Sequence, residues 1–376
     1  MGSGEMSNRL LAAHRMGIER AGAREVVVLD SPFGFQENAP LLAERLTRFF
    51  RTSFGVDASV ASYRSVDDGE VTAERMVAAV RRARYVFAGP GSPSYALGVW
   101  KGAGLAKTLQ NRLATGATVT LASAAALTAG VKTLPVYEIY KVGAELTWLE
   151  GMNVAGDLGM EAVVVPHWNN TEGQGFDTSR CYMGRRRFGL LRSMLPSGVG
   201  VIGLDEHTAG VFDFGKGELS VLGVGRVTLS GSEDLALRHG ERIDLARVFE
   251  LLGSSPEPVR VPPAEPLPTL AEALEAGSAQ GIATTLLAVE ARASAGSEAA
   301  RRQLRAMVLE VSDLVARGLI TRSEWVGDYV DLLVRQRSRL RAEKRWDEAD
   351  RLRADIESLG VALRDTRAGT VWRLME

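Results

Sequence analysis

Short apolar runs alternate with amphipathic segments over the first 253 residues. Residues 25–30 (EVVVLD) predict a buried strand, and residues 39–51 predict a helix because their apolar positions recur at helical spacing. The alternation continues with apolar runs at residues 85–88, 118–122, 162–165 and 200–204. Strands that alternate with helices favour a mostly parallel sheet with helices on both faces. The predicted fold class is therefore α/β, with its chemistry at the carboxyl ends of the strands.

A proline-rich segment at residues 254–268 ends this first region and predicts a semi-rigid linker. Residues 269–338 are rich in Ala, Leu, Arg and Glu and predict a small α-helical domain. Residues 339–376 predict further helices and then a short β-hairpin, because DTRAG is a turn signal between two strand-like runs.

Composition narrows the class of protein. The chain has 376 residues, of which 45% are hydrophobic and 24% charged, with a net charge of −1, so two or three soluble domains are expected. The single cysteine, Cys181, excludes an internal disulfide and a Cys-rich zinc site. Neither a secretory signal nor an apolar run of membrane-spanning length is evident. We therefore expect a cytoplasmic protein without membrane contact.

Two turns that follow predicted strands are candidates for chemistry. In residues 118–130 (TVTLASAAALTAG) an apolar strand leads into Ser123, and small residues then begin a helix. Such a turn exposes the serine hydroxyl, and the N–H groups that follow favour a developing oxyanion. In residues 87–97 (FAGPGSPSYAL) a glycine-rich turn offers a second donor, the Gly91 N–H, but neither a dinucleotide fingerprint nor a P-loop. A helix-capping serine and an ordinary strand-to-helix turn are the competing interpretations.

Titratable residues follow later strands. His167 lies just beyond the predicted strand at residues 162–165, where a general base would be presented. Glu138 is a candidate acid to orient it, with Asp157 as the fallback. Glu206 follows the strand at residues 200–204, next to His207, a second candidate base. Each of these residues taken alone is also compatible with a structural role.

In their order along the chain, these motifs resemble the serine peptidase family that includes dipeptidase E and cyanophycinase, over residues 1 to about 230. The resemblance implies a class I glutamine amidotransferase-like fold with serine in place of cysteine. It implies Ser123 as nucleophile, His167 as base and Glu138 as acid, with the N–H groups of Gly91 and Ala124 as the oxyanion hole. No metal or organic cofactor is implied. The implied substrates are short peptides, including Asp-containing ones, and the implied assembly is a homodimer.

The sequence departs from that family at two places. Leu121 and Ala125 stand where the family elbow has glycines, and the family's first strand is expected upstream of residues 2–5 (GSGE).

Arg185, in a run of three arginines, and Glu206 are candidate substrate-binding residues. The preferred hypothesis is a serine-type peptidase or amidohydrolase. The alternative is an inactive hydrolase-like scaffold that binds tRNA or a protein through its helical tail.

The last forty residues resemble another family. Residues 339–374 look like the C-terminal end of cysteinyl-tRNA synthetases, where helices lead into a D-T-x-x-G-T-x-W-R hairpin. The synthetase's catalytic H-I-G-H and K-M-S-K-S motifs are absent, so aminoacylation is not expected. Basic residues of this region are candidate phosphate contacts to tRNA: Arg335, Arg337, Arg339, Arg341, Lys344 and Arg345. A solvated, charge-balanced helix face is the competing interpretation.

Overall fold

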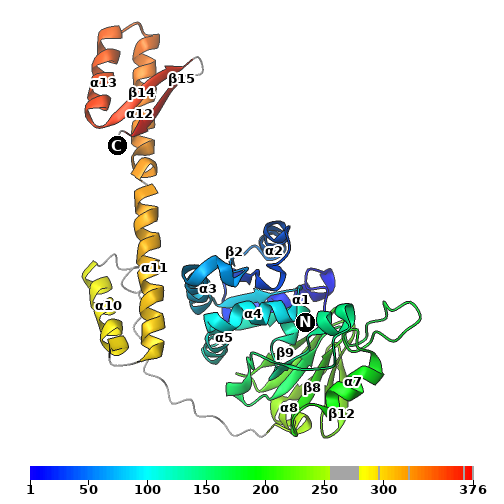
Figure 1. Ribbon diagram of the computed structural model, residues 1–376. Helices are drawn as coiled ribbons and strands as arrows, with labels where there is room; N and C mark the ends of the chain where they lie inside the picture. The colour runs from blue at the N-terminus through cyan, green and yellow to red at the C-terminus, as the bar shows by residue number, and fades with distance from the viewer. Residues whose placement is uncertain (255–278, 295–296, 321, 367–368, 375–376) are drawn as a thin grey trace. The chain divides into compact units, whose positions relative to one another are not determined.

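The computed structural model describes residues 1–254, 279–294, 297–320, 322–366 and 369–374 (Figure 1). The chain divides into two compact units, Met1–Leu267 and Pro268–Glu376. The expected proline-rich linker lies, from residue 255 onward, outside the described residues. Within the described ranges, no helix is both long and apolar enough to cross a membrane.

The first unit contains a parallel four-stranded sheet with the order β2-β1-β3-β4. Its strands are β1 (Glu25–Leu29), β2 (Asp57–Ala61), β3 (Tyr85–Ala88) and β4 (Thr118–Leu121). All three pairings are parallel, so the carboxyl ends of the four strands share one edge. The predicted α/β class with a mostly parallel sheet is confirmed, and that edge is where chemistry is expected.

Helices cover both faces of this sheet (Figure 1). The helices are α1 (Leu11–Ala21) and α2 (Ala39–Phe54) on one face, and α3 (Gly69–Arg82), α4 (Pro93–Ala103) and α5 (Leu105–Ala114) on the other. Val26 and Val28 pack with the first pair, whereas Val27 and Leu29 pack with the other three. Successive strand residues point to opposite faces, so an apolar run such as VVVL is what a sheet buried on both sides requires.

A second four-stranded sheet has the order β12-β11-β8-β7. Its strands are β7 (Ala162–Val165), β8 (Gly200–Leu204), β11 (Arg226–Ser230) and β12 (Asp234–Arg238). β7 and β8 are parallel neighbours, and the other two pairings are antiparallel. The helix α7 (Gly184–Ser193) packs on one face through Phe188 and Leu191. The helix α8 (Leu245–Leu252) packs on the other through Val248 and Leu251.

Further strands complete the first unit. β9 (Thr208–Asp213), β10 (Glu218–Gly223) and β13 (Arg242–Asp244) form an antiparallel sheet in the order β13-β10-β9. β5 (Lys132–Thr133) and β6 (Leu149–Glu150) form a two-residue pairing. Because β8 is followed at once by a turn and then β9, residues 205–207 lie at the carboxyl end of β8.

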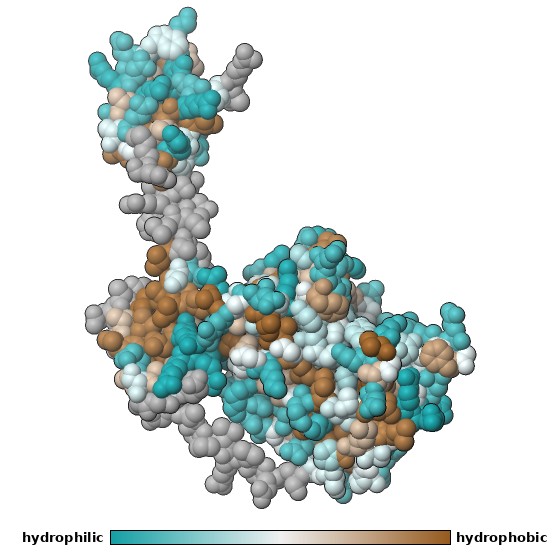
Figure 2. All heavy atoms as spheres, viewed as in Figure 1, coloured by the Kyte–Doolittle hydropathy of each residue, from teal (hydrophilic) through white to brown (hydrophobic). Residues whose placement is uncertain are grey.

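The second unit is built from helices followed by a hairpin, as the sequence predicts. The helices are α10 (Ala279–Ser294), α11 (Glu298–Ile320), α12 (Arg322–Ala342) and α13 (Trp346–Ser358), and the hairpin strands are β14 (Val361–Thr366) and β15 (Gly369–Leu374). Figure 2 shows apolar residues gathered over α10 and α11, where Leu287 and Val308 are exposed. α12 continues through the domain boundary expected at residues 338–339, so that subdivision stays a prediction.

Candidate active site

Ser123 stands on a strained turn between β4 and α6 (Ala124–Leu127). Its φ is +51° and its ψ is −118°, a combination that a residue with a Cβ adopts only when the surroundings enforce it. Backbone bonds hold the turn: Ser123 N–H donates to Met1 O at 3.1 Å, and Ala125 N–H donates to Gly89 O at 3.2 Å. Neither Leu121 nor Ala125 has a positive φ. Leu121 and Ala125 therefore carry no left-handed strain, because the strained residue is the serine itself.

His167 faces the serine from the neighbouring sheet. It follows β7, and its Nε2 lies 2.9 Å from Ser123 Oγ. Its own φ is +49°, and its carbonyl accepts a hydrogen bond from Cys181 N–H at 3.1 Å. The imidazole is only 17% exposed, which limits competition from water. Serine and histidine, 44 residues apart in sequence, thus form a hydrogen-bonded pair.

Glu206 occupies the other side of the imidazole. Its Oε1 lies 2.9 Å from His167 Nδ1 and accepts a hydrogen bond from Asn170 Nδ2, also at 2.9 Å. Asn169 Oδ1 accepts the Glu206 backbone N–H at 2.8 Å, so two consecutive asparagines fix both the carboxylate and its backbone. The hydrogen bonds from His167 and Asn170 hold the pKa of Glu206 below its usual range. The carboxylate is therefore charged and oriented toward the ring.

Glu138, the acid expected to orient His167, does not contact it. It begins a π-helical segment, Glu138–Val142, and its carboxylate accepts a hydrogen bond from Ser94 Oγ. Distance along the chain after the serine could not reveal this, because the position beside His167 is set by the pairing of β7 with β8. That pairing brings Glu206, which follows β8, next to the histidine that follows β7. The fallback acid, Asp157, forms an ion pair with Lys107 at 2.6 Å.

The two expected oxyanion donors flank the serine turn. Gly91 follows β3, the strand next to β4, and has a φ of +144°, where a Cβ would come within 1.9 Å of Pro32 O. Only glycine fits this loop. Across the described ranges, neither the Gly91 N–H nor the Ala124 N–H donates a hydrogen bond to another protein group. Both donors are thus available to a ligand, and their role in catalysis is part of the proposal below.

Two other candidate residues, His207 and Arg185, lie apart from the Ser123–His167 pair. His207 Nδ1 lies 3.4 Å from Ser7 Oγ. The Arg185 side chain is 83% exposed and lies 3.7 Å from Asp177 Oδ2. A substrate-binding role for Arg185 stays a prediction, whereas Glu206, expected to bind substrate, lies against the imidazole.

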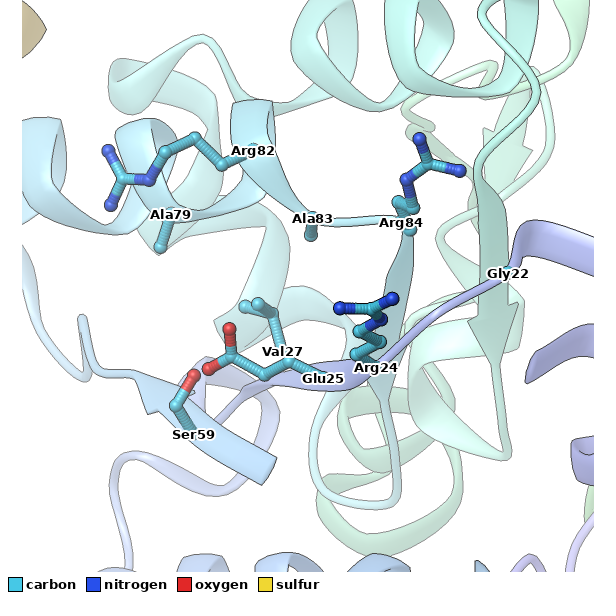
Figure 3. Close-up of a pocket in the computed structure, with 9 residues that line it drawn as sticks. All are labelled: Gly22, Arg24, Glu25, Val27, Ser59, Ala79, Arg82, Ala83 and Arg84. Carbon is cyan, nitrogen blue, oxygen red and sulfur yellow. The ribbon is translucent and has the colours of Figure 1, made fainter. Parts of the chain in front are cut away.

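Two cavities of the first unit differ in their relation to Ser123. One of about 520 Å³ is bordered by Arg24, Arg82 and Arg84, as Figure 3 shows, and lies where β1 and β3 begin, at the edge opposite Ser123. One of these arginines complements the end of α1, because Arg84 Nη1 donates to Ala21 O at 3.2 Å. The other, of about 190 Å³, has Gly91 in its wall. Of these two cavities, only the smaller one adjoins the carboxyl edge of the parallel sheet, where Ser123 lies.

The six basic residues predicted to contact tRNA phosphates fall into two groups. Arg337 is buried, and its guanidinium donates to both carboxylate oxygens of Asp365, at 2.8 and 3.0 Å, and to Thr370 Oγ1. The hydrogen bonds from Arg337 hold the pKa of Asp365 well below its usual range. Arg341 also donates to Asp365, at 2.7 Å, so these two arginines secure α12 to the hairpin.

The other four residues predicted to contact tRNA phosphates lie on the surface. Arg339 and Arg345 form ion pairs with Glu343, and Arg345 also pairs with Glu348. Arg335 and Lys344 are exposed. Arg337 is therefore a structural residue, and the exposed basic residues are the ones that could meet a nucleic acid.

Comparison with known proteins divides the chain in the same way. Residues 327–373 match the family described as the cysteinyl-tRNA ligase anticodon binding domain. A cysteine–tRNA ligase of Pseudomonas fluorescens is 36% identical over 88 residues, which cover 22% of this chain and 19% of the ligase. That of Thermococcus gammatolerans is 46% identical over 46 residues, which cover 12% of this chain and 10% of the ligase. The chain thus spans about a fifth or less of the length of these curated relatives.

A solved structure resembles the first unit. The crystal structure of a peptidase from an acI-B1 actinobacterium covers 65% of this chain and 94% of its own, with 20% sequence identity and a TM-score of 0.52. At this identity the likeness shows a shared fold. The chain therefore joins a peptidase-like α/β fold to a region similar to the anticodon-binding domain of cysteinyl-tRNA ligases.

Proposed function

We propose that the first unit is a serine-type peptidase or amidohydrolase that acts on short peptides, including Asp-containing ones, with Ser123, His167 and Glu206 as its catalytic triad. The observation that carries the proposal is the pair of 2.9 Å contacts that link Ser123 Oγ to His167 Nε2 and His167 Nδ1 to Glu206 Oε1. A nucleophile, a base and an orienting acid in this order are the signature of serine hydrolysis.

The chemistry follows from the direction of each hydrogen bond. The carboxylate of Glu206 can only accept, so His167 carries its proton on Nδ1, and its Nε2 is free to accept the Ser123 proton. As Ser123 Oγ attacks a carbonyl carbon, that proton moves to Nε2 and is then donated to the leaving amine. Water then attacks the acylated Ser123 with the same help from His167, and this step releases the acyl group. The N–H groups of Gly91 and Ala124 would stabilise the oxyanion of each tetrahedral intermediate.

Fluorophosphonate labelling tests the proposal. An activated serine should react covalently, and the adduct should map to Ser123 by mass spectrometry. Labelling should vanish in Ser123→Ala and fall in His167→Gln, while exposed Ser193→Ala leaves it unchanged. A folded wild-type protein that does not react would favour the inactive-scaffold alternative.

The match of residues 327–373 favours a second function, binding of tRNA by the helical unit. Because Arg337 and Arg341 are engaged with Asp365, we propose that Arg335 and Lys344 make phosphate contacts. Each lost phosphate contact should lower the slope of log K against log salt by about 0.9. Filter binding of bulk tRNA between 50 and 200 mM salt, with Arg335→Ala and Lys344→Ala, measures this slope. Absence of binding at low salt would exclude this function.

A further inference from the structure

We propose that Tyr182 is a positioning residue for His167, and that a left-handed turn at residues 180–182 holds its ring against the imidazole. The inference rests on the peptidase function proposed above and adds to it a residue outside the triad. The two ring centroids lie 5.7 Å apart, and the ring planes are inclined by 45°. Tyr182 is half-buried, so it packs as a fixed wall beside the imidazole.

The backbone around Tyr182 is strained. Arg180, Cys181 and Tyr182 have φ values of +61°, +56° and +66°, in the left-handed region that residues with a Cβ rarely enter. Three such residues in succession cost free energy, and they persist only where the surroundings enforce them. Ser123 and His167, two members of the proposed triad, have φ values of +51° and +49°. The strain of the turn thus lies beside that of the triad, as expected where strain serves function.

Hydrogen bonds attach this turn directly to the histidine and to the residue after it. Cys181 N–H donates to His167 O at 3.1 Å, and Arg180 N–H donates to Trp168 O at 3.0 Å. The Arg180 guanidinium carbon also lies 3.8 Å from the centroid of a Trp168 ring, and Cys181 is buried. The turn and the histidine are fixed to each other, so Tyr182 has a defined place beside the imidazole.

The hydroxyl end of Tyr182 reaches the loop that holds the acid. Tyr182 Oη donates to Glu172 Oε2 at 3.1 Å, and Glu172 N–H donates to Asn170 Oδ1, also at 3.1 Å. Asn170 Nδ2 in turn donates to Glu206 Oε1. Glu172 is exposed, so water competes with the hydroxyl for its carboxylate, and that bond contributes little. The ring is therefore expected to carry most of the positioning.

A second aromatic ring supports Tyr182. The centroid of the Tyr140 ring lies 5.1 Å from that of Tyr182, and the two planes are inclined by 34°. Aromatic pairs of this kind contribute beyond the area that they bury. Tyr182 thus has ring contacts with both Tyr140 and His167, which restrict its rotamer before any substrate arrives.

The rate of fluorophosphonate labelling at Ser123 measures the effect on the nucleophile. Tyr182→Ala and Tyr182→Asn both remove the ring, and asparagine tolerates the left-handed backbone, so folding is not at risk in that variant. Both should slow labelling by about 10- to 100-fold, because the imidazole is no longer held in place. Tyr182→Phe, which keeps the ring, should label at nearly the wild-type rate.

Phe35→Ala is the matched control for loss of an aromatic ring. Phe35 is exposed, and its ring pairs with that of Tyr95 at a centroid distance of 5.2 Å. Its removal should leave the labelling rate unchanged. Thermal melting confirms that each variant is folded at the temperature of the measurement.

A proton resonance reports the position of His167 without relying on catalysis. The Nδ1–H that His167 donates to Glu206 should give a low-field NMR signal, and its absence in His167→Gln assigns it among the four histidines. The signal should persist in Tyr182→Phe and should broaden or shift in Tyr182→Asn. A merely structural role of Tyr182 would lower stability but leave the signal of the folded protein unchanged.

Three results would overturn the proposal: wild-type labelling rates in both variants that lack the ring, an equal loss in Tyr182→Phe, or an unchanged His167 signal in Tyr182→Asn. Failure of the hydrolase function is a separate outcome, because it would appear as a lack of labelling in the wild-type protein. In that case the NMR signal would still test the position of the imidazole.

Discussion

Glu206 Oε1 lies 2.9 Å from Nδ1 of His167, although 39 residues separate them in sequence. The contact exists because β7 and β8 are parallel neighbours, so the residues that follow them emerge side by side. The asparagines that follow His167 then bind the carboxylate and backbone of Glu206. The acid of the proposed triad is thus selected by sheet pairing.

Glu206→Gln and Glu138→Gln should separate the two candidate acids. Loss of the Glu206 carboxylate removes the acceptor that sets the His167 tautomer, so kcat/KM should fall by about 10²- to 10⁴-fold. Glu138→Gln should change it by only a few fold, because Glu138 bonds Ser94. Peptide hydrolysis or the rate of fluorophosphonate labelling measures both. Equal losses in the two variants would argue against Glu206 as the orienting acid.

Gly91→Ala should disrupt the loop after β3. The new Cβ would come within 1.9 Å of Pro32 O at a φ of +144°, so the free energy of unfolding should fall by about 2–4 kcal/mol, and labelling of Ser123 should slow. Gly98→Ala is the matched control, because Gly98 is inside α4 with no heavy atom within 4 Å of its added Cβ. It should stabilise the first unit by about 0.5–1 kcal/mol. Urea unfolding measures both changes.

Acid should weaken the first unit through His14. Burial lowers the pKa of His14 from 6.5 to about 4, so between these values the unfolded chain binds a proton that the folded chain does not. Stability should therefore fall as the pH drops from about 6.5 to 4, by at most about 1.4 kcal/mol per pH unit from this residue. Urea unfolding across this range should give a flatter profile for His14→Gln. An unchanged profile would assign the acid sensitivity to other groups.

Arg337→Ala should loosen the helix-and-hairpin part of the second unit. It removes a buried guanidinium and leaves Asp365, which is 37% exposed, with Thr370 Oγ1 at 2.6 Å and Arg341 at 2.7 Å as its nearest partners. The free energy of local unfolding of this helix-and-hairpin part should fall by about 1–3 kcal/mol. Arg335→Ala, on the exposed surface of the same helix, should change it by less than about 0.5 kcal/mol. Hydrogen exchange read by mass spectrometry on peptides from residues 327–366 compares them.

The sequence by itself determined the α/β class and most of the central strands, because buried strands require uninterrupted apolar runs such as VVVL and AVVV. It also located the serine turn and the histidine, because both directly follow such runs. The C-terminal hairpin could also be predicted from the sequence, since a turn signal separates two short strands. These features are local, and local patterns in the sequence carry them.

Tertiary structure alone decided which acid meets His167, and it decided that strain falls on Ser123 while Leu121 and Ala125 remain unstrained. It also showed that Arg337 is an internal residue whereas Arg335 is exposed, although both belong to one charged segment. Each outcome depends on which strands pair and which helix face is covered. Those are contacts between segments far apart in the chain, and spacing along the sequence does not encode them.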